Sequence, residues 1–566
     1  YDPRANFNGM RYMDFAAHVD QSIVKRVITR HRLKKKDPKV EVSEPVEPIV
    51  YYVDRGIPEP IRSAIIEGAS WWNQAFEAAG YRDAFQVKLL PEDADPLDVR
   101  YNTINWIHRS TRGWSYGSSI TDPRTGEIIK GHANICSLRI RHDFLIAEGL
   151  AANYEEGKED TFEMLEMSLA RIRQLSVHEV GHTLGLGHNY ASHVNDRSSV
   201  MDYPAPRVKI KEDGSLDLSD AYARGIGEWD KVSIAYGYQD FPEGVDEEKG
   251  LKAILEDAFA RGLVFIPGQD TGPSGAHPLA APWVTGRHPV DELERIMRVR
   301  SLALNAFSER KIHVGAPMAT LEEVLVQVYL HHRYQVESAA SVLGGLYYYH
   351  TLRGDVQKNP ELVPAEEQRL ALDVLLATIK PESLAIPEKI LGLIPPRPPT
   401  YPQHEDLFLG YTGLTFDPLG AVETAANLTV SLILYPDRAA RLVEYHSRDT
   451  SLPSLGEVVD KLIGATWKSS LSSSYYAEIQ RVVNHVVLFN LMRLASNEKM
   501  ASQVRAVATT KLDELKEWLS QQLGVVKDEN QKAHYLYAVS QIKVFQENPE
   551  KVKLTVPLAI PKGPPI

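Results

Sequence analysis

One short stretch of the chain carries histidines and a glutamate at the spacing of a catalytic zinc site. His178 and His182 are four residues apart, so on a helix both imidazoles project from one face and can bind the same ion. Glu179 would point at a water molecule on that ion and act as the general base. Gly185 lets the chain leave the helix, and His188 then supplies a third nitrogen. Three protein ligands leave one coordination position open, which predicts one catalytic Zn²⁺.

Chance rarely produces the whole string. In a chain of 566 residues with 19 His and 36 Gly, the pattern HExxH alone arises by accident in about one such chain in twenty to thirty, and the full HExxHxxGxxH in roughly one in ten thousand. The alternative is a buried helix end that happens to be rich in histidine. The rarity of the full string favours the zinc site.

A second motif follows the histidines. Residues 199–204 read Ser-Val-Met-Asp-Tyr-Pro and resemble the Met-turn of the metzincin clan of zinc endopeptidases. The Ser-x-Met-x-Tyr form is most similar to astacins and serralysins. That resemblance implies that Met201 forms an apolar floor under the metal and that Tyr203 contacts the zinc or the tetrahedral intermediate. Without the histidine string, both residues would be ordinary core residues.

A predicted hairpin supplies a candidate substrate-binding strand. Residues 113–121 and 127–135 alternate small, polar and apolar side chains on either side of an Asp-Pro-Arg-Thr-Gly turn. The resemblance implies that the first strand forms the upper rim of the cleft, where free backbone groups pair with an extended peptide. The candidate contact residues are Trp114, Ser115, Tyr116, Gly117, Ser118 and Ser119. The alternative is an ordinary sheet edge without substrate contacts.

The elements that must position the zinc site are predicted on both sides of it. A helix that begins near Asp160 or Thr161 carries the first two histidines on its last turns. A helix at 227–237 resembles the one that closes metzincin domains. Strands are predicted at 49–53, 85–90 and 103–107, and an amphipathic helix at 61–79.

The predicted fold class is an α+β metzincin-like catalytic domain, with a mixed twisted sheet and an active-site helix, followed by a mainly α-helical C-terminal region. The predicted divisions are a lead-in segment at 1–44, the zinc peptidase domain at 45–240, a loop-rich connector at 241–290 and a helical domain at 291–566. One helical patch is expected in the lead-in, around residues 23–28. Helical periodicity in the C-terminal region is clearest at 321–334, 368–379, 455–463, 476–495, 500–519 and 530–544.

Composition excludes several classes of protein. A net charge of −12 argues against a general nucleic-acid binder, and the one basic run, 30–36, is typical of a solvated connector. The sequence contains no run of eighteen apolar residues, so it predicts no transmembrane segment. The single cysteine, Cys136, has no partner for an internal disulfide. Because the chain starts Tyr1-Asp2-Pro3-Arg4, we expect further N-terminal domains before it, and packing of the lead-in against them.

The resemblance extends over nearly the full length to a large, poorly characterised bacterial family of exported zinc-dependent metalloproteases. It implies a zinc-dependent endopeptidase that acts on a peptide or protein substrate in the periplasm, at the cell surface or after secretion. Two alternatives stay open: a zinc-binding scaffold without turnover, and a zinc amidase that acts on cell-wall peptide. The intact Glu179 argues against the scaffold.

Overall fold

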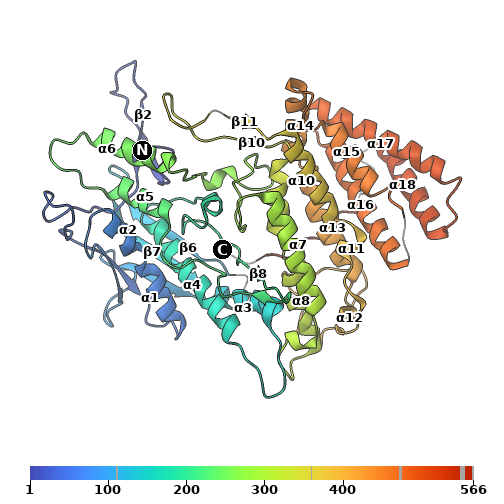
Figure 1. Cartoon of the computed structure of the whole chain (residues 1–566), viewed down its shortest axis with the longest axis horizontal. Coiled ribbons are helices and arrows are strands. Elements are labelled where there is room, and N and C mark those ends of the chain that lie inside the picture. Colours follow the sequence, from blue (N-terminus) through green and yellow to red (C-terminus); the bar gives the residue numbers. More distant parts are fainter. Residues whose placement is uncertain (110–112, 359, 471–473, 549–554, 564–566) are drawn as a thin grey trace.

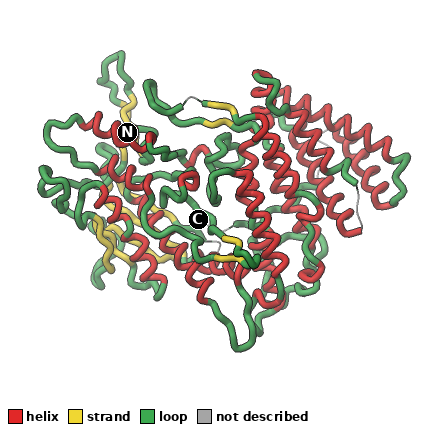
Figure 2. Tube along the Cα trace, viewed as in Figure 1, coloured by secondary structure: helices red, strands yellow, loops and turns green. Residues whose placement is uncertain are grey.

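The computed structural model describes residues 1–109, 113–358, 360–470, 474–548 and 555–563. A half that contains the main sheet and a half built from helices lie side by side (Figure 1). Figure 2 shows that most strands lie in the N-terminal half, and that helices make up most of the C-terminal half. The protein therefore has the α+β catalytic part and the mainly helical C-terminal region that the sequence predicts.

A five-stranded mixed sheet forms the framework of the N-terminal half. Its strand order is β4-β3-β5-β7-β6, with β3 parallel to β4 and β5, β5 parallel to β7, and β6 antiparallel at one edge. Alternate residues of β3 are buried, as expected for a β-favouring apolar run. The strands are β3 Ile49–Val53, β4 Phe85–Leu89, β5 Asn102–Ile107, β6 Tyr116–Thr121 and β7 Ile128–Cys136. All five confirm the predicted strands.

The helix α4, Phe162–Thr183, is the central element of this half. It packs against strands β6 and β7 and against two helices, α1 (Ile61–Ser70) and α3 (Leu138–Ala151). The carboxylate of Asp160 accepts a hydrogen bond from the first helical N–H, at 2.9 Å. The helix therefore begins where the sequence predicts and carries His178 and His182 on its last turns. The amphipathic segment after β3 continues as α2, Trp72–Ala78, and the closing helix is α5, Glu228–Tyr238.

One sequence prediction about local structure is wrong. The patch at 23–28 is not helical: strand β2, Val24–Ile28, pairs antiparallel with β1, Gly9–Met13. The β-branched residues of the patch favour a strand once a partner strand is present. The segment at 241–290, predicted as a loop-rich connector, contains the helix α6, Glu247–Ala260. Leu255 and Ala258 of α6 are buried in the core of the N-terminal half.

The C-terminal half is an assembly of helices with one small β-ladder. This ladder pairs β10, Leu346–Tyr347, with β11, Glu361–Leu362. Another small ladder lies earlier in the chain, before α5, and pairs β8, Lys209–Ile210, with β9, Leu216–Asp217. The helices are α7 Pro289–Ala306, α8 Leu321–Tyr329, α9 Arg333–Val342, α10 Ala365–Thr378, α11 Pro381–Leu384, α12 Glu388–Leu391, α13 Pro418–Ile433, α14 Pro436–Arg448, α15 Leu455–Ala465, α16 Ser474–Ser496, α17 Ser502–Gln522 and α18 Glu529–Glu547. Within the described ranges, none of the helices is both long and apolar enough to cross a membrane.

The hydrophobic core of the helical half reaches into the N-terminal half. Ile146 and Leu150 of α3, and Met164 and Met167 of α4, belong to the same buried cluster as the helices from α7 onward. A separate cluster fills the space around the sheet and the last turns of α4. The start of the zinc-site helix is therefore packed by the helical half, and its end by the sheet.

Candidate metal centre

The structure brings the three predicted ligands together. His178 and His182 come from the end of α4, and His188 follows after the chain has turned back. One ligand nitrogen from each histidine lies within 4.8 Å of the others. The Nε2 atoms of His182 and His188 are 3.1 Å apart, close to the separation of two nitrogens that bind one zinc ion at about 2.0–2.1 Å each.

Backbone carbonyls orient two of these imidazoles. Nδ1 of His178 lies 2.8 Å from the carbonyl oxygen of Val200, and Nδ1 of His182 lies 2.9 Å from that of Leu186. Donation of the Nδ1 proton to a carbonyl leaves the Nε2 lone pair for a metal. Nε2 of His178 is buried and has no hydrogen-bond partner among the described residues. These residues therefore fit a zinc ion.

Burial keeps the three imidazoles in the form that binds metal. It lowers the pKa of His178 and of His182, and lowers that of His188 to about 3. A neutral imidazole has a lone pair to donate, whereas an imidazolium has none. The donor set is thus ready for a divalent cation at neutral pH.

The carboxyl group of Glu179 lies in the same buried region. Burial raises its pKa to about 8, while the charge of Arg171 and a hydrogen bond from the backbone N–H of Gly117 act in the opposite direction. Its Oε1 atom has no partner among the described residues. A carboxyl group with a pKa near neutrality can both accept and return a proton, which is the property that a general base and acid needs.

The turn between the second and third histidines depends on Gly185. Its φ is +100°, a backbone conformation that residues with a Cβ rarely adopt. A Cβ at this position would also lie 1.9 Å from the carbonyl oxygen of Thr29. The sequence prediction that glycine is needed here is explained by both observations.

Met201 is fully buried and lies against α4 at Gly181. A Cβ on Gly181 would lie 2.2 Å from its Sδ atom. The backbone just before Met201 is anchored by Asp230 of α5, whose carboxylate accepts hydrogen bonds from the Ser199 hydroxyl (2.6 Å) and from the N–H of Val200 (2.8 Å). Asp230 therefore fixes the carbonyl that orients His178. Sequence reasoning missed this residue.

Tyr203 contacts the site with its ring. The ring centroid lies 4.9 Å from that of His178 and 4.7 Å from that of His188. Trp283 stacks on the other side at 5.4 Å, and the hydroxyl of Tyr203 is hydrogen-bonded to that of Tyr190. Trp283 comes from the segment predicted to be a connector, and neither it nor Tyr190 belongs to a motif.

The predicted substrate strand lies directly beside α4. Gly117 of β6 approaches so closely that a Cβ there would lie 2.0 Å from the carbonyl oxygen of Glu179. Trp114 and Tyr116 are exposed, and so is Ser118, whereas Gly117 and Ser119 are half-buried. Ser115 is buried, and its hydroxyl accepts a hydrogen bond from the N–H of Cys136. The candidate substrate-binding residues are therefore divided between exposed, half-buried and buried positions. Ser115 is the buried one and faces the protein interior.

The N-terminal segment also forms hydrogen bonds to the loop between His182 and His188, which is called the zinc loop below. The sequence did not indicate these contacts. The N–H of Asn8 donates to the carbonyl of Gly185 at 2.8 Å, and the N–H of Gly187 donates to that of Asn6 at 2.9 Å. The side-chain amide of Asn8 donates to the carbonyl of Leu186, which also orients His182. Residues 6–8 are called the N-terminal clamp below. No local motif marks them.

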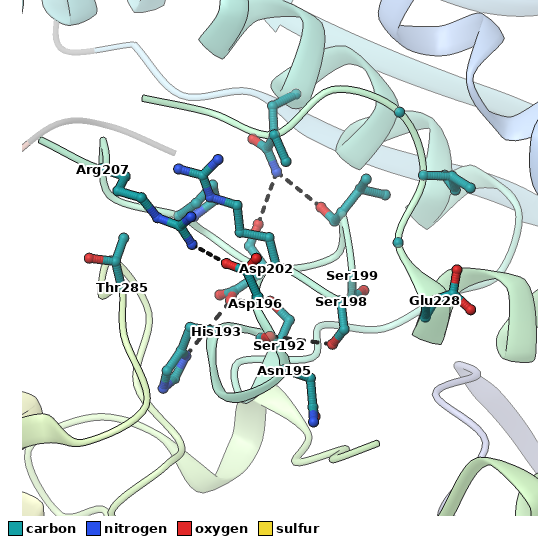
Figure 3. Close-up of a pocket in the computed structure, with 18 of the residues that line it drawn as sticks. Ser192, His193, Asn195, Asp196, Ser198, Ser199, Asp202, Arg207, Glu228 and Thr285 are labelled. Atoms are coloured by element: carbon teal, nitrogen blue, oxygen red, sulfur yellow. Dashed lines mark hydrogen bonds and ion pairs between the residues drawn. The ribbon is translucent and has the colours of Figure 1, made fainter. Parts of the chain in front are cut away.

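A cavity of about 270 Å³ is lined in part by the 199–204 segment (Figure 3). Its lining includes His193 and Asp202, and the Asp202 carboxylate accepts a hydrogen bond from Ser192. None of the three zinc-site histidines lines this cavity. The cavity is therefore a neighbour of the metal centre and not part of it.

Comparison with known proteins agrees with this geometry. A family model described as Met-zincin matches residues 160–473, more than half of the chain. No curated protein and no solved structure matches the chain. The matched residues include the three histidines, Glu179 and the 199–204 segment. The chain therefore belongs to the Met-zincin family, and it is a metallopeptidase with zinc as its cofactor.

Proposed function

We propose that this protein is a zinc-dependent endopeptidase and that Glu179 is its general base. The observation that carries the proposal is the convergence of three imidazole nitrogens within 4.8 Å of one another, beside a buried carboxyl group with an unpartnered oxygen. A bound zinc ion lowers the pKa of its water and polarises the scissile carbonyl. His178, His182 and His188 hold the ion.

Glu179 takes the proton from the attacking water and delivers it to the leaving amine. Burial of the Glu179 carboxyl group, which raises its pKa, supports the return of the proton to the leaving amine. Tyr203, whose ring lies against two of the histidines, is the candidate donor to the developing oxyanion. Met201 is buried, and we assign it the role of an apolar floor against which the metal ligands pack.

The proposed substrate is a peptide or protein in an extended conformation. It would pair with the backbone of β6, which lies at the edge of the sheet and passes directly over Glu179. Trp114 and Tyr116 are exposed beside this edge and supply side-chain contacts. By family resemblance, we propose that the enzyme acts outside the cytoplasm.

Metal analysis combined with casein digestion tests the proposal. We expect about one zinc per chain and loss of digestion with a phenanthroline chelator. Glu179→Gln should keep the zinc and lower turnover by at least roughly a hundredfold, whereas His188→Ala should weaken zinc binding. Glu166→Gln, on the same helix, is the matched control and should change neither.

Three results would contradict the proposal in different ways. A protein without zinc, or digestion that ignores the chelator, would remove the metal from the mechanism. Release of muropeptide fragments without cleavage of casein would identify a cell-wall amidase. Bound zinc without any turnover would identify a scaffold.

A further inference from the structure

A polar cleft of about 430 Å³ lies beside two of the zinc-site histidines. His182 and His188 line it together with residues between 1 and 9, residues between 265 and 269, and His350. This volume falls within the range of pockets that bind ligands. The cleft is thus built from four segments that are far apart in the sequence, and one of them, which carries His350, belongs to the helical half.

His350 is held in the wall of this cleft by a carboxylate. Its Nε2 atom lies 2.7 Å from Oδ2 of Asp270, and Asp270 also accepts a hydrogen bond from the hydroxyl of Tyr348. The imidazole is one-third exposed. With Nε2 directed at Asp270, the other ring nitrogen is left for a ligand.

The turn that carries Asp270 also touches the metal centre. Gly268–Asp270 forms a short 3-10 helix, and a Cβ on Gly268 would lie 3.2 Å from Nδ1 of His188. The same turn therefore contacts a zinc ligand at one end and holds His350 at the other. A substrate residue next to the scissile bond would lie between them.

Asn6 is the second unusual residue of the cleft. It is 4% exposed, and neither its side-chain nitrogen nor its oxygen has a hydrogen-bond partner among the described residues. Its φ is +60°, in the left-handed region. An unpartnered buried amide in this conformation costs stability, and such features concentrate at functional sites. The amide can both donate and accept, as recognition of another amide requires.

We infer that this cleft is a substrate subsite for an uncharged polar residue next to the scissile bond, with His350 and Asn6 as its hydrogen-bonding groups. No Asp, Glu, Lys or Arg is among the described residues that line it. A lysine or arginine side chain of the substrate would therefore meet no carboxylate among these lining residues, whereas an amide or hydroxyl would find partners. The inference rests on the proposed peptidase function.

Steady-state kinetics on matched peptides test the subsite. The peptides differ only by Gln, Leu or Lys at the positions that flank the cleaved bond. His350→Ala should raise KM for the Gln peptides about tenfold with kcat and zinc content unchanged. Asn6→Gly should do the same, because glycine tolerates the positive φ and keeps the backbone carbonyl that binds the N–H of Gly187. His313→Ala is the matched control, because His313 pairs with Glu159 at 2.9 Å and does not line the cleft. An unchanged KM, or an equal rise for Gln and Leu peptides, would overturn the inference.

A binding measurement separates this inference from the proposed function. Zinc-loaded Glu179→Gln protein is titrated with fluorescein-labelled casein, alone and combined with His350→Ala. A Kd about tenfold weaker in the double variant supports the subsite, even if the wild-type protein cleaves nothing. An equal Kd in the two proteins would overturn the subsite and leave the peptidase proposal to its own test.

Discussion

Tyr203 shows how much chemistry depends on a single atom at this site. Its ring packs between two imidazoles and Trp283, while its hydroxyl is bonded to Tyr190. Packing needs only the ring, and oxyanion stabilisation needs the hydroxyl. We expect Tyr203→Phe to lower kcat about tenfold to a thousandfold with little change in KM.

The control for this variant is Tyr190→Phe, which removes the partner hydroxyl and leaves that of Tyr203 in place. It should keep kcat within about fivefold of the wild type, since one neutral hydrogen bond contributes roughly 1 kcal/mol. If Tyr203→Phe kept its full kcat while Tyr203→Ala unfolded at a lower temperature, Tyr203 would be a packing residue only.

Asp230 acts on the metal through the backbone. Its carboxylate accepts hydrogen bonds from the Ser199 hydroxyl and from the backbone N–H groups of Val200 and Gly227. Asp230→Asn places an amide N–H₂ against donors, so we expect a loss of about 1–3 kcal/mol in the free energy of unfolding. Zinc affinity should fall about tenfold to a hundredfold, because the carbonyl that orients His178 is no longer fixed.

Urea unfolding and competition with a chelator measure these two effects. Asp257→Asn is the control, because Asp257 is exposed on α6. An Asp230→Asn protein with wild-type zinc affinity would show that the anchor is dispensable for the metal.

At the scale of elements, the N-terminal clamp is the least expected part of the metal centre. Phe7 is buried against Gly237 of the closing helix, and its neighbours hydrogen-bond to the zinc loop. Phe7→Ala should destabilise the protein by about 3–5 kcal/mol, as for other buried aromatic residues. It should also release zinc more readily to a chelator.

Phe15→Ala is the matched control, because Phe15 lies in the same segment and is 80% exposed. It should change neither stability nor zinc release. A Phe7→Ala protein that holds zinc as tightly as the wild type would show that the loop keeps its shape without the clamp.

The histidine string and the N-terminal clamp show which features of the site can be predicted from the sequence and which cannot. The three ligands, Glu179 and Gly185 lie on one helix and its exit turn, so their spacing alone defines the geometry. The strands are predictable for the same reason, since the alternation in β3 is local. The clamp joins residues 178 positions apart, mostly through backbone groups that every residue has. Hydrogen bonds between backbone groups can form with almost any residue type, so the sequence does not reveal them.

Asp230 and His350 escape prediction for a related reason. Each is an ordinary polar residue on a helix or loop until the fold brings it to its partner, which is Ser199 for one and Asp270 for the other. Only the tertiary packing, which depends on many apolar contacts at once, decides which polar residues meet. The sequence therefore predicts the ligands and misses the groups that position ligands and substrate.

At the scale of the whole molecule, the buried histidines predict sensitivity to acid. Burial lowers the pKa of four histidines outside the metal centre to about 4, and these are His31, His277, His331 and His534. In the unfolded chain a histidine takes up a proton near pH 6.5. Below that pH the unfolded state binds more protons than the folded state, so the free energy of unfolding falls as the pH drops from about 6.5 toward 4.

Thermal melting of the zinc-free protein between pH 7 and pH 4.5 checks this prediction. Asp230, whose pKa is raised to about 7 by burial, acts in the opposite direction, so a variant must isolate the histidine contribution. His534→Phe keeps a ring that can stack on Trp467 and should flatten the dependence on pH. Equal slopes for variant and wild type would show that His534 does not contribute.

The same packing has a consequence for the order in which the protein is made. The clamp, the three histidines and the helix with Asp230 all lie within the first 238 positions, whereas the cleft is closed by a residue at position 350. A ribosome completes the parts that hold zinc long before it adds His350 and the helices whose core supports α4. The residues that would hold zinc and those that position them therefore come earlier in the chain than the residue that completes the proposed substrate cleft.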